Sequence, residues 1–122
     1  MRVLMIIPAY NEEESIFDTV TSILSYRKKV DFDLDYVVIN DGSTDKTKQI
    51  LEDNHFNAVN LVMNLGIGGA VQTGYKYALE HDYDVAVQFD GDGQHDIESL
   101  SDLLEPIRKN EEIGRASCRE RV

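Results

Sequence analysis

The chain has 122 residues, of which 42% are hydrophobic and 29% are charged, a balance typical of one globular domain. This composition excludes a disordered, collagen-like or disulfide-rich protein, and the single cysteine, Cys118, excludes an internal disulfide. Lysine and arginine number 12 against 23 aspartate and glutamate residues, for a formal charge of -11. That charge repels a phosphate backbone, so we expect no general nucleic-acid binding.

The longest apolar run, Val3 to Ile7, is far shorter than the roughly 20 residues that cross a bilayer. The same run lacks the length and the cleavage site of a secretory signal. We therefore expect a cytoplasmic chain in which nothing spans a membrane.

The first strand and helix are predicted near the N-terminus. Val3 to Ile7 is a continuous apolar run bounded by Pro8, which favours a strand buried on both faces. Asn11 is predicted to cap the helix that follows, with Glu14 three residues on. Four apolar residues share one face of that helix: Ile16, Val20, Ile23 and Leu24.

A second strand is predicted from Tyr36 to Ile39, where β-branched residues precede a polar turn. Ser43 or Thr44 is predicted to cap the next helix, which carries Ile50 and Leu51. The strand and helix unit therefore repeats.

Two further pairs of a strand and a helix are predicted. Ala58 to Met63 is predicted as a weaker third strand, and Gly69 to Glu80 as a helix with Val71, Tyr75 and Leu79 at helical spacing. Asp84 to Phe89 is predicted as the fourth strand. The last predicted helix has apolar residues at intervals of three and four: Ile97, Leu100, Leu104 and Ile107.

This alternation predicts a doubly wound, mostly parallel α/β sheet of the Rossmann-like kind, with right-handed crossovers. Ligands bind such sheets outside the carboxyl ends of the strands, where the strand order reverses. Four polar motifs follow the four predicted strands: Pro8 to Glu12, Asp41 to Asp45, Asn64 to Gly69, and Asp90 to His95. Their common edge is the predicted site.

The acidic turn after the fourth strand carries the strongest chemical signal. Asp90, Asp92 and Gln94 place two carboxylates and an amide oxygen in a glycine-flexed turn. A hard divalent cation, Mg²⁺ or Mn²⁺, would relieve the repulsion between the carboxylates and accept phosphate oxygens. A solvated acidic turn without a ligand is the competing interpretation.

Other phosphate or metal motifs do not fit the spacing. An EF-hand loop starting at Asp90 would need glycine in place of His95 and glutamate in place of Ser101. A dinucleotide loop at Gly66 to Gly69 would need a third glycine where Val71 stands.

Three of the motifs together resemble a known family: Pro8-Ala9-Tyr10-Asn11-Glu12, Asn40 to Asp45, and Asp90 to His95. The chain resembles the family 2 glycosyltransferases of GT-A fold, most closely their polyprenyl-phosphate glycosyltransferase branch, which includes dolichyl-phosphate mannose synthase. The resemblance runs from Val3 to about Glu111. It implies a truncated domain, residues 1–111, that corresponds to the nucleotide-sugar-binding half.

The resemblance also implies roles for individual residues. Asp41 would read the base of the nucleotide, and Asp92 would be the catalytic group, which holds the metal. The implied metal ligands are Asp90, Asp92 and Gln94, with Asp90 also facing the nucleotide. The implied substrate-binding residues are Pro8, Ala9, Tyr10, Asn11, Glu12, Asp41, Gly68, Gly69 and Asp90. Many relatives have lysine where this chain has Ile67, so the metal and the backbone N–H groups near Gly68 would carry more of the diphosphate binding.

The reaction implied is transfer of a sugar from a UDP- or GDP-linked donor to a polyprenyl phosphate, at the cytosolic face of the membrane in the intact protein. For this chain we expect donor binding without turnover. Two alternatives stay open: a transferase acting on a saccharide hydroxyl in cell-wall or capsule polysaccharide synthesis, and a noncatalytic nucleotide-binding module.

Residues 112–122, EIGRASCRERV, differ abruptly in composition from the rest of the chain. The string looks like the translation of a sequencing-library adapter, so we expect a non-native tail. A genuine basic tail that binds an acidic partner is the alternative.

Overall fold

The computed structural model describes residues 2–30 and 32–89 of the chain. The predicted fourth helix, the acidic turn from Asp90 to His95 and the tail at 112–122 all lie outside the described residues.

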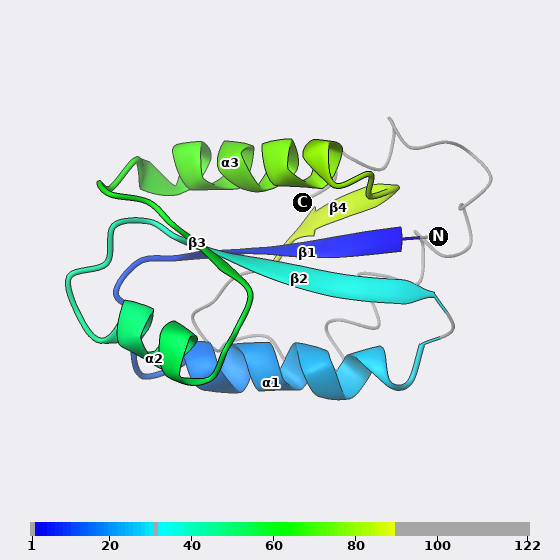
Figure 1. The fold of residues 1–122 in the computed structure, drawn as a ribbon, viewed down its shortest axis with the longest axis horizontal. Coiled ribbons are helices and arrows are strands. Elements are labelled where there is room, and N and C mark those ends of the chain that lie inside the picture. The colour runs from blue at the N-terminus through cyan, green and yellow to red at the C-terminus, as the bar shows by residue number, and fades with distance from the viewer. Residues whose placement is uncertain (1, 31, 90–122) are drawn as a thin grey trace.

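The described residues form four strands and three helices in alternation (Figure 1). In chain order they are β1 (Arg2–Ala9), α1 (Ile16–Arg27), β2 (Asp33–Asn40), α2 (Thr47–Asp53), β3 (Ala58–Asn60), α3 (Gly66–Glu80) and β4 (Val85–Gln88).

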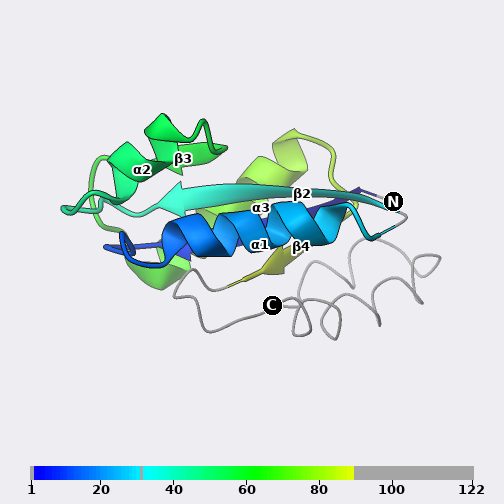
Figure 2. The same ribbon diagram turned by 90° about the horizontal axis from the view of Figure 1, so that it is seen from below.

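The strands form one parallel sheet in the order β3-β2-β1-β4. β1 lies between β2 and β4, so the direction of winding reverses at β1. Helix α3 covers one face of the sheet, and α1 and α2 cover the other (Figures 1 and 2). The predicted doubly wound α/β fold is therefore confirmed.

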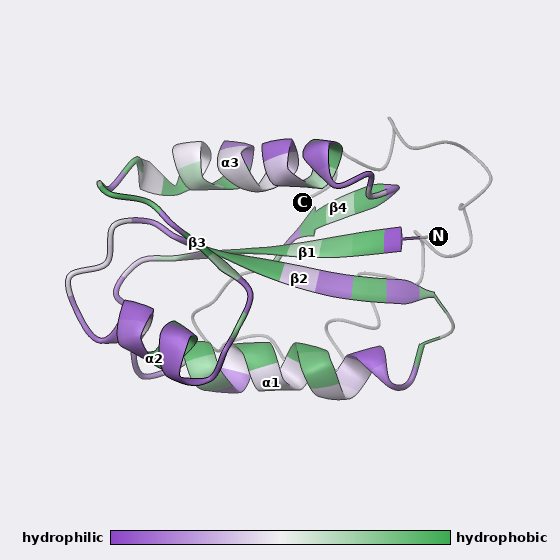
Figure 3. Cartoon of the chain, in the orientation of Figure 1, coloured by the Kyte–Doolittle hydropathy of each residue, from purple (hydrophilic) through white to green (hydrophobic). Residues whose placement is uncertain are grey.

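Side chains of β1 alternate between two cores, as a strand buried on both faces requires. Val3, Met5 and Ile7 join the core beneath α1 and α2. Leu4 and Ile6 join the core beneath α3. Figure 3 shows β1 as hydrophobic along nearly its whole length, which explains why the sequence of this strand lacks a polar alternation.

Both predicted helix caps are wrong. Helix α1 begins at Ile16 with Ser15 as its N-cap, four residues after Asn11. Helix α2 begins at Thr47 with Lys46 as its N-cap, and neither helix has a side-chain hydrogen bond from its N-cap residue. Asn11 has a left-handed backbone, with φ of 54°, and its side chain bonds to the loop after β2 instead.

The predicted inner face of α3 is displaced by one residue. Three small residues of α3 are buried: Ala70, Gly74 and Ala78. Val71 and Tyr75 are half-buried beside them, and Leu79 is exposed. Small side chains let the helix axis approach the sheet closely, and this packing outweighs the larger apolar residues that the periodicity selected.

The predicted boundaries of two elements shift as well. The third strand ends at Asn60 instead of Met63, and α3 begins at Gly66 instead of Gly69. The predicted apolar faces of α1 and α2 are confirmed, with Ile16, Val20, Ile23 and Leu51 buried.

The contact between α3 and β1 predicts a large cost for one added methyl group. A Cβ built at Gly74 would lie 2.3 Å from Cγ2 of the buried Ile6. We expect Gly74→Ala to lower the free energy of unfolding by about 1–3 kcal/mol, since overpacked cores lose about that much. Urea denaturation followed by circular dichroism measures the change.

The matched control is Gly68→Ala on the same helix, where a Cβ would meet nothing within 4 Å. That variant should be neutral or slightly stabilising, because alanine favours helix more than glycine does. Equal stability of the two variants would contradict the close packing of α3 on β1.

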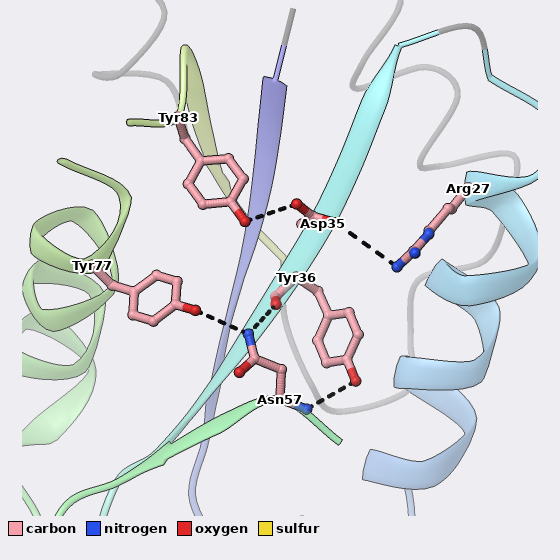
Figure 4. Close-up of polar contacts among 6 residues, drawn as sticks. All are labelled: Arg27, Asp35, Tyr36, Asn57, Tyr77 and Tyr83. Atoms are coloured by element: carbon pink, nitrogen blue, oxygen red, sulfur yellow. Dashed lines mark hydrogen bonds and ion pairs between the residues drawn. The ribbon is translucent and has the colours of Figure 1, made fainter. Parts of the chain in front are cut away.

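A polar network at the opposite end of the sheet from the loops after β1 and β2 ties β2 to its neighbours (Figure 4). Tyr83 donates a hydrogen bond to Asp35 Oδ2 at 2.8 Å, and Arg27 lies 3.8 Å from Asp35 Oδ1. Asn57 Nδ2 donates to the carbonyl oxygen of Tyr36 at 2.9 Å and to the Tyr77 hydroxyl at 3.2 Å. Burial, together with the Asp35 carboxylate, raises the pKa of Tyr83 to about 12. The Tyr83 hydroxyl group is therefore protonated at neutral pH and donates to Asp35.

Candidate functional site

The loops after β1, β2 and β3 meet at the carboxyl edge of the sheet (Figure 1). Asp41 N donates a hydrogen bond to the Ala9 carbonyl oxygen at 2.8 Å, which joins the first two loops. Asn64 Nδ2 donates to the Asp41 carbonyl oxygen at 3.2 Å, which joins the third. Three of the four predicted motifs are thus brought together.

Asp41 lies at the centre of this edge and is only 3% exposed. Its Oδ1 accepts a hydrogen bond of 2.7 Å from the backbone N–H of Leu65. The adjacent Gly42 has φ of 70°, and a Cβ at Gly42 would lie 2.6 Å from backbone atoms of Met63 and Asn64. Only glycine permits this approach, so Gly42 sets how closely the loop after β3 sits beside Asp41.

The predicted residues of the first motif differ in exposure. Ala9 is buried, Pro8 and Glu12 are half-buried, and Asn11 is exposed. Tyr10 is 46% exposed, so part of its ring is available to a ligand at the edge of the sheet. An exposed aromatic face can stack on a planar base.

Gly68 and Gly69 lie in the first turn of α3 instead of in a loop. The first N–H groups of a helix have no carbonyl partner within the helix, and they favour negative charge. Leu65 N and Gly66 N are bonded to Asp41 and Asn64 side chains. The N–H groups that follow them in the turn are suited to a phosphate.

The first two loops are also joined by side-chain hydrogen bonds that the sequence pattern did not predict. Asn11 N donates to Ser43 Oγ at 3.0 Å, Glu12 N to Thr47 Oγ1 at 3.0 Å, and Glu13 N to Asp45 Oδ2 at 3.2 Å. The Asp45-x-Thr47 spacing was the available signal, since aspartate commonly bonds the backbone two residues on.

Asp45 is ionised within this network. Burial alone would raise its pKa, but hydrogen bonds from Thr47 and from the Glu13 N–H outweigh burial and lower the pKa below the ordinary value of 3.8. A lowered carboxyl pKa stabilises the fold above the unfolded-state pKa, and that contribution is lost as the pH falls through the lowered value. The two loops are therefore held together throughout the neutral range.

The fourth motif begins where the described chain ends. Phe89 N donates to the Ile6 carbonyl oxygen at 2.8 Å, which sets the end of β4 beside β1. The predicted metal ligands Asp90, Asp92 and Gln94 follow and lie outside the described residues. Within residues 2–30 and 32–89, no three histidine, cysteine, aspartate or glutamate residues are grouped to hold a metal ion.

None of the helices within the described part of the chain is both long enough and apolar enough to span a membrane.

Comparison with known proteins identifies the family. The family model described as "Glycosyl transferase family 2" matches residues 5–120 of the chain. The chain belongs to glycosyl transferase family 2. The family and the GT-A-like fold expected from the three motifs are thereby confirmed.

Two relatives with different names illustrate what the chain is similar to. The chain is 39% identical over 113 residues to an undecaprenyl-phosphate mannosyltransferase of Micrococcus luteus, covering 88% of this chain and 45% of that protein. It is 32% identical over 123 residues to a poly-beta-1,6-N-acetyl-D-glucosamine synthase of Staphylococcus epidermidis, covering 96% of this chain and 28% of that protein. The chain thus spans less than half the length of either relative.

Among solved structures, the fold is similar to that of glucosyl-3-phosphoglycerate synthase from Mycobacterium tuberculosis, in a crystal structure with Mn²⁺, UDP-glucose and phosphoglyceric acid. The TM-score is 0.67 at 23% identity, covering 87% of this chain and 39% of that one. At this identity the likeness concerns the family 2 fold.

Proposed function

We propose that this chain is the donor-binding part of a metal-dependent glycosyltransferase that transfers a sugar from a UDP- or GDP-linked donor to a polyprenyl phosphate. The observation that carries the proposal is the placement of Asp41, whose carboxylate is anchored to Leu65 N–H where three loops meet at the carboxyl edge. That edge is where doubly wound sheets bind nucleotides.

Asp41 and Tyr10 fit the base of a nucleotide. A carboxylate accepts hydrogen bonds from the imide N–H of uracil or from the amino and imino groups of guanine, and a half-exposed ring can stack on either base. Because Asp41 is held by a backbone bond, its carboxylate is oriented before the ligand arrives. Pro8, Ala9, Asn11 and Glu12 would form the wall of the same pocket.

The diphosphate needs positive charge, and the described edge supplies little of it. The loops after β1 and β2 carry Glu12, Glu13, Glu14, Asp41 and Asp45 against Lys46, and Lys48 lies in the first turn of α2. Position 67, in the first turn of α3, is an exposed isoleucine. An acidic edge repels a diphosphate unless a cation intervenes, so we assign the main neutralising role to a metal, with backbone N–H groups near Gly68 and Gly69 assisting.

The donor set Asp90, Asp92 and Gln94 fits Mg²⁺ or Mn²⁺, because both ions prefer carboxylate and amide oxygens. A metal bound there would stabilise the charge of the departing diphosphate. The protein's own residues would bind the base, orient the diphosphate and hold the sugar for attack. Asp92 is the residue to which we assign the catalytic role.

The acceptor is proposed from the relatives. The undecaprenyl-phosphate relative has the higher identity of the two named above, and a phosphate oxygen is ionised near neutral pH, so transfer to it needs no protein base. The intact protein would then work at the cytosolic face of a membrane. The polysaccharide synthase relative favours a saccharide hydroxyl as the second candidate, and that acceptor would need a base.

Calorimetry of the chain with UDP and with GDP, each with and without Mn²⁺, tests the donor site. We expect one nucleotide to bind only when Mn²⁺ is present, and Asp92→Ala to reduce the affinity to that measured without metal. Asp96→Ala, which alters an acidic residue outside the proposed ligand set, is the matched control and should bind as the parent chain does.

Three outcomes would contradict parts of the proposal. If neither nucleotide binds with Mn²⁺ to a chain that circular dichroism shows to be folded, the donor site is wrong. Equal binding with and without metal would overturn the metal's role. Release of sugar from a nucleotide sugar would contradict the expectation that this chain binds the donor without turnover.

A further inference from the structure

The loops after β1 and β2 are joined by an unusual set of hydrogen bonds. Three consecutive backbone N–H groups, those of Asn11, Glu12 and Glu13, each donate to a side-chain oxygen of the loop after β2 or of Thr47, the first residue of α2. In return, Asn11 Oδ1 accepts from Thr44 N at 2.8 Å and from Asp45 N at 3.3 Å. The bonds run in both directions, so each loop both donates to and accepts from the segment across from it.

Thr47 occupies the buried centre of this set. Its residue is 0% exposed, and its hydroxyl group accepts the hydrogen bond from Glu12 N while donating one to Asp45 Oδ1. Thr47 N donates to the same carboxylate oxygen at 2.9 Å. A single hydroxyl thus links a backbone N–H of the first loop to an ionised carboxylate of the second, and bonds to a charged acceptor are stronger than neutral ones.

The position of this link bears on the nucleotide. Asn11 has φ of 54°, a left-handed backbone that asparagine adopts more readily than most residues. Its N–H group and its side chain are both bonded to the loop after β2. Tyr10 and Glu12 flank Asn11 in the chain, and both belong to the pocket proposed above. Their placement therefore depends on bonds made by residues that lie outside that pocket.

We propose that Thr47 is a positioning residue for nucleotide binding: its hydroxyl couples the loop after β2 to the loop after β1, so that both present one pocket to the donor. This inference rests on the proposed donor site. Thr47 contributes through the backbone of Glu12 and the carboxylate of Asp45, without a contact to the nucleotide.

Two substitutions separate the hydroxyl from the packing of the side chain. Thr47→Val keeps the shape and both branches but removes the hydroxyl, whereas Thr47→Ser keeps the hydroxyl and removes the buried methyl group. We expect Thr47→Val to raise the Kd of the nucleotide, measured with Mn²⁺, about tenfold, the scale of a lost bond to a charged group. Thr47→Ser should stay within about twofold of the parent chain, since the bond persists.

Thr19→Val is the matched control. Thr19 is likewise buried, at 4% exposure, and its hydroxyl donates to the Ser15 carbonyl oxygen within its own helix region. The same chemical change should leave the nucleotide Kd unaltered there. A role for Thr47 in packing alone predicts the opposite ranking, with serine worse than valine, and that ranking would overturn the proposal.

Hydrogen exchange on the nucleotide-free chain provides a second measurement. The amide of Glu12 should be protected in the parent chain and in Thr47→Ser. It should exchange faster in Thr47→Val, where its acceptor is missing. If Thr47→Val does not fold, Ser43→Ala, which removes the acceptor for Asn11 N and the donor to Asn40 Oδ1 but leaves Thr47 and Asp45 in place, should raise the Kd in the same direction by a smaller factor. Unchanged exchange and unchanged affinity would overturn the coupling.

The two proposals fail differently. If the parent chain binds no nucleotide, the donor site and the positioning role fall together. If it binds and Thr47→Val binds equally well, the donor site stands and only the positioning role is lost.

Discussion

Replacing Asp41 by asparagine is expected to weaken nucleotide binding by about 10- to 100-fold while leaving the fold intact, because bonds to a charged group are worth about 1.5–3 kcal/mol. Asparagine can still offer its oxygen to Leu65 N–H, the bond that anchors the loop after β3. Its amide group, however, presents a donor where the carboxylate would accept a hydrogen of the base. Calorimetry with Mn²⁺ and nucleotide measures the loss.

Asp53→Asn, the same change at an exposed position near the end of α2, is the control and should leave the affinity unchanged. Asp41→Ala should weaken binding at least as much and should also lower the free energy of unfolding, because the Leu65 anchor is removed. Parent-like affinity in Asp41→Asn would exclude Asp41 from reading the base.

Gly42→Ala is expected to be the most damaging single-methyl change at the edge of the sheet. A left-handed backbone costs an ordinary residue about 1–2 kcal/mol, and the new Cβ would lie 2.6 Å from the backbone of Met63 and Asn64. Backbone atoms cannot turn aside as a side chain can, so overpacking adds about 1–3 kcal/mol. We expect a total loss of about 2–5 kcal/mol in urea denaturation, together with weaker nucleotide binding, since the loops beside Asp41 are forced apart.

Gly66→Ala separates these two costs. Gly66 also has a left-handed backbone, with φ of 83°, but a Cβ there would meet nothing within 4 Å. The difference in unfolding free energy between the two variants therefore measures the close approach alone. If Gly42→Ala and Gly66→Ala prove equally stable, the loop after β3 does not lie against Gly42.

The strands could be predicted because their signal is local and strong. The unbroken apolar run from Val3 to Ile7 indicated a strand buried on both faces, and the structure divides its side chains between two cores. Helix starts were less predictable, because they depend on contacts distant in sequence. Asn11 has the chemistry of a cap, but its side chain bonds to backbone N–H groups more than 30 residues away.

In the candidate site, too, some features could be predicted from the sequence and others could not. That Asp41 and the loop after β1 lie together follows from parallel strands ending at one edge, so the sequence pattern was sufficient. Ser43 was predicted as a cap, but its hydroxyl group accepts from Asn11 N in the loop after β1. The Asp45-x-Thr47 spacing indicates only the local turn, and the bond from Glu12 N to Thr47 joins residues distant in sequence. The inner face of α3 was missed because Ala70, Gly74 and Ala78 are small, and hydrophobic periodicity favours large residues.

The strand order β3-β2-β1-β4 also governs how the domain can assemble as the chain leaves the ribosome. The pair β1 and β2 is complete once the first 40 residues have emerged, and these residues include the loop that carries Asn11. Thr47, the first residue of α2, follows within a few residues more. The pairing of β1 with β4 joins Val3 to Val85, a far longer closure, and non-local pairing of this kind is slow. Until α3 has emerged and packs on β1, Leu4 and Ile6 lack its cover, so the nascent chain exposes apolar surface beside an already assembled half of the proposed pocket.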